Sequence, residues 1–136
     1  MIKVIMGVKG SGKTKLLIDM VQKALDEEQG DVIVIEKEQS LTYDIPHQAR
    51  LIVAADYFFG STEYMKGFLS GLHASNYDIS YVFIDNLYKM FDDHSVNTAE
   101  DFLDWLNAFS EAQKVSFVLT LSAPVESATD RIKKYF

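Results

Sequence analysis

A glycine-rich segment of eight residues constrains the fold of this chain more than any other part of the sequence. Residues 7–14 read G-V-K-G-S-G-K-T and match the pattern G-x-x-x-x-G-K-[ST] at every fixed position. A short apolar run, Ile2–Met6, precedes the segment, and an amphipathic run, Leu16–Leu25, follows it. Because the apolar positions of the second run recur with helical spacing, the sequence predicts a strand, a tight glycine loop and a helix in immediate succession.

This arrangement has the chemistry of a phosphate-binding loop. Glycines let backbone N–H groups approach phosphate oxygens, and the start of the next helix presents the positive end of its dipole. Lys13 is expected to reach the β- and γ-phosphates, and the Thr14 hydroxyl to bind Mg²⁺. The alternative is a glycine-rich turn that precedes a helix by chance. The motif and its flanks favour a nucleotide-phosphate site made by Gly7, Val8, Lys9, Gly10, Ser11, Gly12, Lys13 and Thr14.

Strands and helices alternate along the rest of the chain. Further strands are predicted at Val32–Ile35, Leu51–Ala54, Tyr81–Ile84 and Val115–Leu121. Helices are predicted at 13–28, from Gly60-Ser61-Thr62 onward, from Asn97-Thr98 onward, and between Pro124 and Phe136. Thr98 and Asp101 resemble a capping box for the third helix. This alternation predicts an α/β fold with a parallel five-stranded sheet and helices on both faces, and we expect residues 1–136 to form a single domain.

An acidic residue follows one of these predicted strands. Asp85 comes directly after the run Tyr81–Ile84. A carboxylate at the carboxyl end of a buried strand is the Walker B arrangement, which holds Mg²⁺ directly or through water. The alternative is an aspartate that opens the turn Asp85-Asn86. Because a phosphate-binding loop precedes it in the same chain, we interpret Asp85 as the partner of Thr14 in binding the metal.

Composition narrows the setting of the protein. The net charge of −7 argues against general nucleic-acid binding, which needs a basic surface. No apolar stretch approaches the roughly 18 to 20 residues of a membrane span. The sequence has no cysteine, which excludes disulfides and thiolate metal sites, and it shows no signal peptide before the first strand. We therefore expect a cytoplasmic protein.

With both motifs placed, the chain resembles the P-loop NTPases, and among them the RecA-like ATPase core. The resemblance covers nearly the whole chain in the order of its elements, and the glycine loop is its specific part. In RecA-like proteins a glutamate after the second strand polarises the attacking water, and the resemblance places it at Glu38, with Glu36 as second candidate. It also implies a γ-phosphate sensor at the end of the last strand, where Thr120 or Ser122 stands. Either hydroxyl is equally an ordinary strand-end group.

The chain departs from the family pattern in its shortage of arginine. Arg50 and Arg131 are its only arginines, and both are interpreted as structural, so no arginine finger is evident. A neighbouring subunit or partner protein is therefore expected to complete the site. Tyr88, Met90 and Phe91 are a candidate apolar patch for such self-association.

The expected function is binding of Mg²⁺–ATP with slow or partner-stimulated ATPase activity. Lys13, Glu38 and Asp85 are the predicted catalytic residues, and Thr14 and Asp85 are the predicted metal ligands. One alternative is a small-molecule or nucleoside kinase, although two arginines are few for a phosphate-clamping lid. The other is a binding module that uses nucleotide as a switch without turnover. The absence of an N-K-x-D motif lowers the expectation of guanine specificity.

Overall fold

All five strands of the sheet run in the same direction. The computed structural model describes residues 1–27, 30–39, 44–57 and 60–136. The strands are β1 (Ile2–Gly7), β2 (Asp31–Glu36), β3 (Arg50–Val53), β4 (Ile79–Ile84) and β5 (Ser116–Ser122). They pair in the order β1-β5-β4-β2-β3. The predicted α/β fold with a parallel five-stranded sheet is confirmed.

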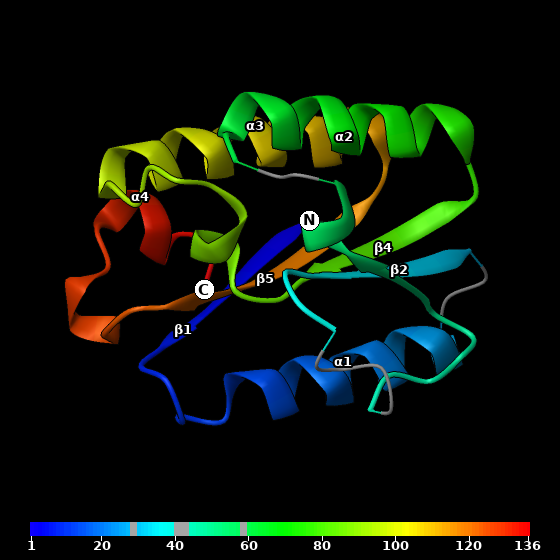
Figure 1. Cartoon of the computed structure of the whole chain (residues 1–136), viewed down its shortest axis with the longest axis horizontal. Coiled ribbons are helices and arrows are strands. Elements are labelled where there is room, and N and C mark those ends of the chain that lie inside the picture. The colour runs from blue at the N-terminus through cyan, green and yellow to red at the C-terminus, as the bar shows by residue number, and fades with distance from the viewer. Residues whose placement is uncertain (28–29, 40–43, 58–59) are drawn as a thin grey trace.

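Helices cover both faces of this sheet (Figure 1). The α-helices are α1 (Lys13–Glu27), α2 (Thr62–Ser75), α3 (Val96–Gln113) and α4 (Asp130–Lys133), and the 3-10 turns are η1 (Ala54–Tyr57), η2 (Leu87–Met90) and η3 (Val125–Ser127). Helix α1 lies on one face, and α2 and α3 lie on the other, where Lys66 of α2 sits over the Trp105 ring of α3. Among the residues that the structure describes, no helix is both long and apolar enough to cross a lipid bilayer.

Strand β2 shows why the sheet is covered on both sides. Val32 and Val34 pack in the same core cluster as Leu17 of α1. Ile33 and Ile35 belong to a second cluster, which includes large buried apolar side chains of α2 and α3. Successive side chains of a strand point to opposite faces, so an uninterrupted β-branched run needs an apolar layer on each side.

The parallel pairing brings the carboxyl ends of four strands to one edge of the sheet. Gly7 of β1 lies opposite Ser122 of β5. Ile84, the last residue of β4, lies opposite Leu119 of β5 and Ile35 of β2. In open parallel sheets ligands bind outside the carboxyl ends of the strands. The segments that leave β1, β2, β4 and β5 therefore meet where a ligand is expected.

The start of α3 differs from the prediction. The helix begins at Val96, and Ser95 is its N-cap, whose Oγ accepts a hydrogen bond from the Thr98 N–H at 3.3 Å. The predicted capping box of Thr98 and Asp101 is wrong, because the Thr98 hydroxyl donates to Asp93 at 2.6 Å. The local turn before the helix thus uses the hydroxyl that the capping box would have required.

The C-terminal segment is less helical than predicted. In place of one helix between Pro124 and Phe136, the structure has η3 and the four-residue α4. The segment is held instead by an edge contact, since the Val4 N–H of β1 donates to the Tyr135 carbonyl at 2.7 Å. A strand edge that is partly covered in this way offers fewer backbone groups to another chain.

Candidate functional site

The glycine loop follows the tight course that its sequence predicts. β1 ends at Gly7 and α1 begins at Lys13, so residues 8–12 turn the chain from the sheet into the helix. Gly10 and Gly12 have φ values of +85° and +90°, in the left-handed region that residues with a side chain rarely adopt. The loop conformation therefore requires glycine at both positions.

The Lys13 side chain curls back against this loop. Its residue is 9% exposed, and its Nζ donates to the Val8 carbonyl at 3.1 Å. The Ser11 N–H donates to the same carbonyl at 3.1 Å. One backbone oxygen thus holds both the loop and the ammonium group, which places a positive charge beside the loop backbone. Such a combination suits an anion.

The N-terminus of α1 adds to the positive character of the loop. The helix is 15 residues long and has no acidic residue in its first turn. The N–H groups of a first helical turn have no carbonyl to bond within the helix, and the helix dipole places partial positive charge there. The first hydrogen bond of the helix type runs from Leu16 N–H to Gly12 carbonyl, at 3.1 Å. The amides of residues before Leu16 therefore lie at the loop, as an anion site requires.

Asp85 is held in place by Thr120. The Thr120 hydroxyl donates to Asp85 Oδ1 at 2.8 Å and accepts from the Asn86 N–H at 2.7 Å. Thr120 is fully buried, and its one hydroxyl proton is used by Asp85. Of the two sensor candidates, Thr120 therefore positions the Asp85 carboxylate. Ser122 lies two residues further along β5 and is the last residue of the strand.

A hollow of about 440 Å³ is lined by both the glycine loop and the Asp85–Thr120 pair, and we call it the phosphate hollow. It brings the glycine loop together with the ends of β4 and β5, so the predicted Lys13, Thr14 and Asp85 share one space. Its lining residues are Lys9, Gly10, Lys13, Thr14, Asp85, Asn86, Lys89, Thr120 and Ser122.

The donor set of the phosphate hollow fits magnesium better than a metal that needs a full protein cage. Among the described residues, no group of three or more His, Cys, Asp or Glu side chains is placed to hold a metal ion. Thr14 and Asp85 offer one hydroxyl and one carboxylate. Mg²⁺ keeps several waters and binds through one or two carboxylates plus substrate phosphates. The two residues therefore suit a metal that arrives with a phosphate ligand.

The two candidate glutamates lie beside Asp85, outside the phosphate hollow. Glu36 ends β2 and is 2% exposed, whereas Glu38 is exposed. The Asp85 N–H donates to the Ile35 carbonyl at 2.9 Å, so Asp85 lies level with the end of β2. A smaller hollow of about 60 Å³ is lined by Glu36, Glu38 and Asp85 together with Lys37, Asn86 and Lys89. Because Ile35 pairs with Ile84, the next residues, Glu36 and Asp85, lie at the same level at the strand ends, whereas Glu38 lies two residues beyond the end of β2.

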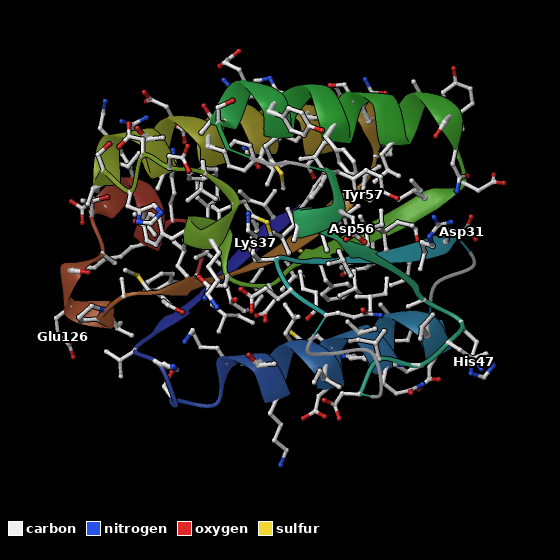
Figure 2. The ribbon with its side chains drawn as sticks, viewed as in Figure 1. Asp31, Lys37, His47, Asp56, Tyr57 and Glu126 are labelled. Atoms are coloured by element: carbon white, nitrogen blue, oxygen red, sulfur yellow. The ribbon has the colours of Figure 1, made fainter. Side chains whose placement is uncertain are left out.

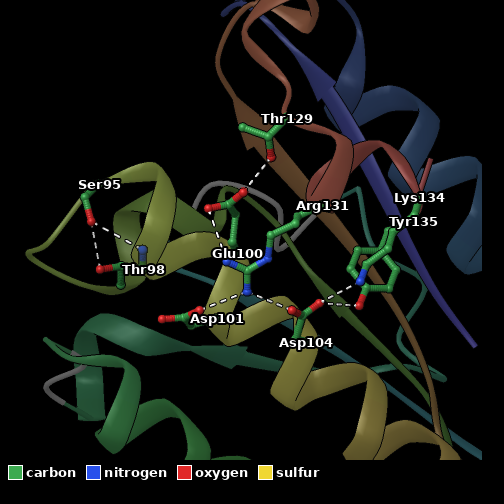
Figure 3. A network of polar contacts seen from close by, with 9 residues as sticks. All are labelled: Ser95, Thr98, Glu100, Asp101, Asp104, Thr129, Arg131, Lys134 and Tyr135. Carbon is green, nitrogen blue, oxygen red and sulfur yellow. Dashed lines mark hydrogen bonds and ion pairs between the residues drawn. The ribbon is translucent and has the colours of Figure 1, made fainter.

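Arg131 is fully engaged in a structural network (Figure 3). Its guanidinium pairs with Asp101 at 2.9 Å, with Asp104 at 2.8 Å and with Glu100 at 3.5 Å, and so ties α4 to α3. The hydrogen bond from Arg131 lowers the pKa of Asp104 to about 2, and Tyr135 also donates to this carboxylate, at 2.7 Å. The same network raises the pKa of Arg131. These contacts agree with the structural role predicted for this arginine.

Arg50 lies at the other end of the sheet. It is the first residue of β3, whereas Gly7 and Ser122 are the last residues of their parallel strands. It lines a separate hollow with Asp31 and Asn76. Neither arginine therefore lines the phosphate hollow.

The predicted apolar patch after Asp85 is wrong. Met90 and Phe91 are 0% and 3% exposed and belong to the core between the sheet, α2 and α3. Tyr88 is half-buried, and burial raises the pKa of its hydroxyl, with a smaller contribution from Glu100. A 3-10 turn is too short to show a repeating pattern of apolar residues in the sequence. The burial of Met90 and Phe91 was therefore not evident from the sequence alone.

Another hollow, of about 370 Å³, lies against the glycine loop and has a largely apolar wall. It shares Gly7, Val8, Ser11, Gly12 and Lys13 with the loop and adds Ile5, Met6, Leu16, Pro124, Val125 and Glu126 (Glu126 is labelled in Figure 2). Leu16 and Val125 are 47% and 44% exposed, so apolar surface is accessible at this point.

Lys89 is the residue of the site that the sequence patterns did not indicate. It lines the phosphate hollow and the smaller hollow beside Glu36. It follows Asp85 by a short turn, but a lysine in a turn is usually a solvated surface residue. Only its position in the folded structure, in the hollow that also contains Lys13 and Asp85, identifies it as a candidate site residue.

Comparison with known proteins adds no family to these observations. A scan against protein-family models found no match, and a search of curated proteins found no significant similarity.

Proposed function

We propose that this protein binds a Mg²⁺–nucleoside triphosphate, with ATP as the expected nucleotide, and hydrolyses it slowly or under stimulation by a partner. The observation that carries the proposal is that the glycine loop, Thr14 and Asp85 line one hollow. A glycine loop alone accommodates an anion. A hydroxyl and a carboxylate facing the same space also provide for the metal that accompanies a nucleoside triphosphate. On this basis we place the chain among the P-loop NTPases, with the RecA-like ATPases as the expected group.

Four residues of the phosphate hollow have defined roles in this proposal. Lys13 neutralises charge on the γ-phosphate as the transition state forms. Thr14 and Asp85 hold Mg²⁺, and Thr120 keeps the Asp85 carboxylate in one orientation through its 2.8 Å hydrogen bond. The metal, when bound, would neutralise charge on the β- and γ-phosphate oxygens.

A carboxylate beside Asp85 orients the attacking water. Sequence resemblance favours Glu38, whereas register and burial favour Glu36. A buried carboxylate acts at a lower local dielectric than an exposed one, so its effect on a nearby water is stronger. We therefore propose Glu36 as the principal water-orienting residue and Glu38 as a secondary one.

The order of the strands supports hydrolysis of the RecA-like type. β5 lies between β1 and β4, so its carboxyl end stands between the glycine loop and Asp85. Ser122 at this end lines the phosphate hollow. This is where the γ-phosphate sensor of the RecA-like pattern is expected.

A kinase is the second candidate, and one hollow favours it. Beyond Glu38 lies a space of about 470 Å³ whose lining includes Lys37, Tyr88, Lys89 and His94. This hollow is wide open to solvent, so it would admit a small phosphoryl acceptor next to the proposed γ-phosphate position without enclosing it. The shortage of arginines in the site weighs against this alternative.

Nucleotide binding is the decisive test. Titration calorimetry with ATP, ADP and GTP, with and without Mg²⁺, should show Mg²⁺-dependent binding to the wild type and none to Lys13→Ala. A wild-type protein that binds none of these nucleotides would overturn the proposal.

Product analysis separates the two candidate reactions. With ATP labelled at the γ-phosphate, hydrolysis releases labelled inorganic phosphate. Transfer of the label to an added small-molecule acceptor would favour the kinase. Nucleotide binding without either product would leave only a nucleotide-dependent binding module.

A further inference from the structure

We propose that Lys89 is a catalytic residue that contacts the γ-phosphate from the same chain and supplies the positive charge for which no arginine is placed. This inference rests on the proposed function. It concerns a residue that follows the strand-end carboxylate and belongs neither to the glycine loop nor to a partner subunit.

The position of Lys89 connects the phosphate hollow with the candidate water-orienting acids. Lys89 lines the hollow that contains Lys13, Thr14 and Asp85. It also lines the smaller hollow that contains Glu36 and Glu38. A γ-phosphate that is held by the glycine loop and attacked by water near Glu36 lies between these two spaces. Lys89 is thus at their common boundary.

The backbone of Lys89 is firmly anchored, although its side chain is exposed. It lies in η2 between Leu87 and Met90, both of which are 0% exposed. Its N–H donates to the Asn86 carbonyl at 3.0 Å, and the Asn86 N–H donates to Thr120 at 2.7 Å. A side chain that starts from a fixed backbone loses less freedom when it binds a ligand.

The backbone conformation at Asn86 directs η2 to this position. Asn86 has a φ of 59° and a ψ of 73°, in the left-handed region, which asparagine tolerates better than most residues. Asp85 and η2 are therefore separated by a single sharply turned residue. The same turn that presents Asp85 to the metal position brings Lys89 to the rim of the phosphate hollow.

The charge of Lys89 is available to a ligand. In the described part of the chain, the ion pairs involve Lys66, Arg131 and Lys134, and Lys89 is in none of them. Arg131 is held by three carboxylates, and Arg50 begins β3 at the opposite end of the sheet. Lys89 is therefore the cation outside the glycine loop that the described structure places in the phosphate hollow.

The chemical step leaves Lys89 unchanged. The water oxygen forms a bond to the γ-phosphorus, the bond from that phosphorus to the β–γ bridging oxygen breaks, and ADP leaves with the electron pair. The proton of the water passes through the neighbouring glutamate to phosphate or solvent. Lys89 remains protonated and donates hydrogen bonds to γ-phosphate oxygens, whose charge is spread over three positions in the transition state.

The test compares Lys89→Ala and Lys89→Arg with a matched control, Lys23→Ala. Lys23 is an exposed lysine of α1 that lines none of the hollows described above. Calorimetry gives the Kd of ADP and of the non-hydrolysable analogue AMP-PNP, both with Mg²⁺. Because Lys89 is proposed to contact only the γ-phosphate, Lys89→Ala should weaken AMP-PNP about tenfold and leave ADP unchanged. Lys89→Arg should retain most of the wild-type affinity for AMP-PNP, and Lys23→Ala should match the wild type with both nucleotides.

Turnover provides the second measurement. Loss of one group that stabilises developing charge costs roughly 10²- to 10³-fold in kcat, and we expect Lys89→Ala to fall in or just below this range, with KM for ATP raised about tenfold, in line with the Kd of AMP-PNP. Trapping of ADP with aluminium fluoride should be lost in parallel. If the wild type binds both nucleotides and Lys89→Ala leaves the AMP-PNP to ADP ratio unchanged, the role of Lys89 is refuted and the proposed function stands. If the wild type binds neither nucleotide, the proposed function itself fails.

Discussion

At the scale of single residues, one hydroxyl links two strands of the site. Thr120 of β5 donates to Asp85 and accepts from the Asn86 backbone, both of which follow β4. It is fully buried, so no water replaces either hydrogen bond when the hydroxyl is removed. The side chain that resembles a ligand sensor in the sequence thus positions Asp85, the carboxylate proposed to bind the metal.

Substitution of Thr120 should show how much its hydroxyl contributes to the stability of the fold and to nucleotide affinity. Thr120→Val keeps the shape but leaves the Asn86 N–H and the Asp85 carboxylate without this partner, and we expect a loss of about 1–3 kcal/mol in the free energy of unfolding. Mg²⁺-dependent nucleotide affinity should fall with it. Thr120→Ser retains the hydroxyl and should keep most of both properties. Urea denaturation and calorimetry measure the two effects, and equal affinity in Thr120→Val and wild type would contradict the positioning role.

The two glutamates at the end of β2 offer a second residue-scale prediction. Glu36→Gln should lower kcat by about 10²-fold or more, as expected for loss of a general base, and Glu38→Gln should lower it less. Both changes keep the side-chain shape, so nucleotide affinity should remain close to that of the wild type. Single-turnover hydrolysis of ATP measures the difference. A larger loss in Glu38→Gln would restore the order that the sequence resemblance suggests.

At the scale of elements, α1 and α2 use glycine in opposite ways. Gly12 at the start of α1 has a φ of +90°, whereas a methyl group added at Gly67 within α2 would meet no non-local atom within 4 Å. Gly12→Ala should therefore distort the loop, with strain of about 1–2 kcal/mol and weaker nucleotide binding. Gly67→Ala should stabilise the protein by about 0.5–1 kcal/mol, because alanine favours the helix. Paired urea denaturation curves show whether Gly12→Ala lowers and Gly67→Ala raises the free energy of unfolding.

The attachment of α4 to α3 should depend on pH. Arg131 lowers the pKa of Asp104 from 3.8 to about 2, so this interaction stabilises the fold fully above pH 4. The contribution disappears as the pH falls from about 4 towards 2, where the folded-state carboxylate takes up its proton. The pair is partly exposed, which limits its contribution to about 1 kcal/mol.

The matched variants for this effect are Asp104→Asn and Asp19→Asn. Asp104→Asn should lose stability at pH 7 and show a flatter stability profile between pH 4 and 2, as measured by urea denaturation. Asp19 is an exposed residue of α1 and takes part in none of the ion pairs of the described residues. Asp19→Asn should therefore follow the wild-type profile, and identical profiles for all three proteins would contradict the proposed contribution of Asp104.

The elements that could be predicted from sequence are those with one dominant local signal. α1 combines an apolar stripe with a glycine loop before it, and β2 is an unbroken β-branched run, so both lie where predicted. The start of α3 was missed because Ser95 and Thr98 are both good N-caps, and Asp93 decides between them through the Thr98 hydroxyl. Lys89 and the role of Thr120 depend on which strands become neighbours, and a local pattern does not contain that information.

At the scale of the whole molecule, an acidic chain surrounds a cationic site. The net charge is −7, yet Lys9, Lys13 and Lys89 line the phosphate hollow. The site is assembled from the loop after β1 and from the ends of β4 and β5, which are distant in the sequence. A ligand that contacts all three segments binds the folded chain and not the unfolded one. Its binding energy therefore adds to the stability of the whole sheet.

This coupling yields a prediction for the intact protein. At a concentration of Mg²⁺–ATP 100 times its Kd, binding should add about 2.7 kcal/mol to the free energy of unfolding and raise the Tm by roughly 10 °C. Lys13→Ala should lose this shift because it lacks the ammonium group that Val8 holds beside the loop. Removal of Mg²⁺ with a chelator should reduce the shift in the wild type, since Thr14 and Asp85 then have no metal to bind. Thermal melts with and without nucleotide measure all three, and a shift that survives Lys13→Ala would place the nucleotide outside the phosphate hollow.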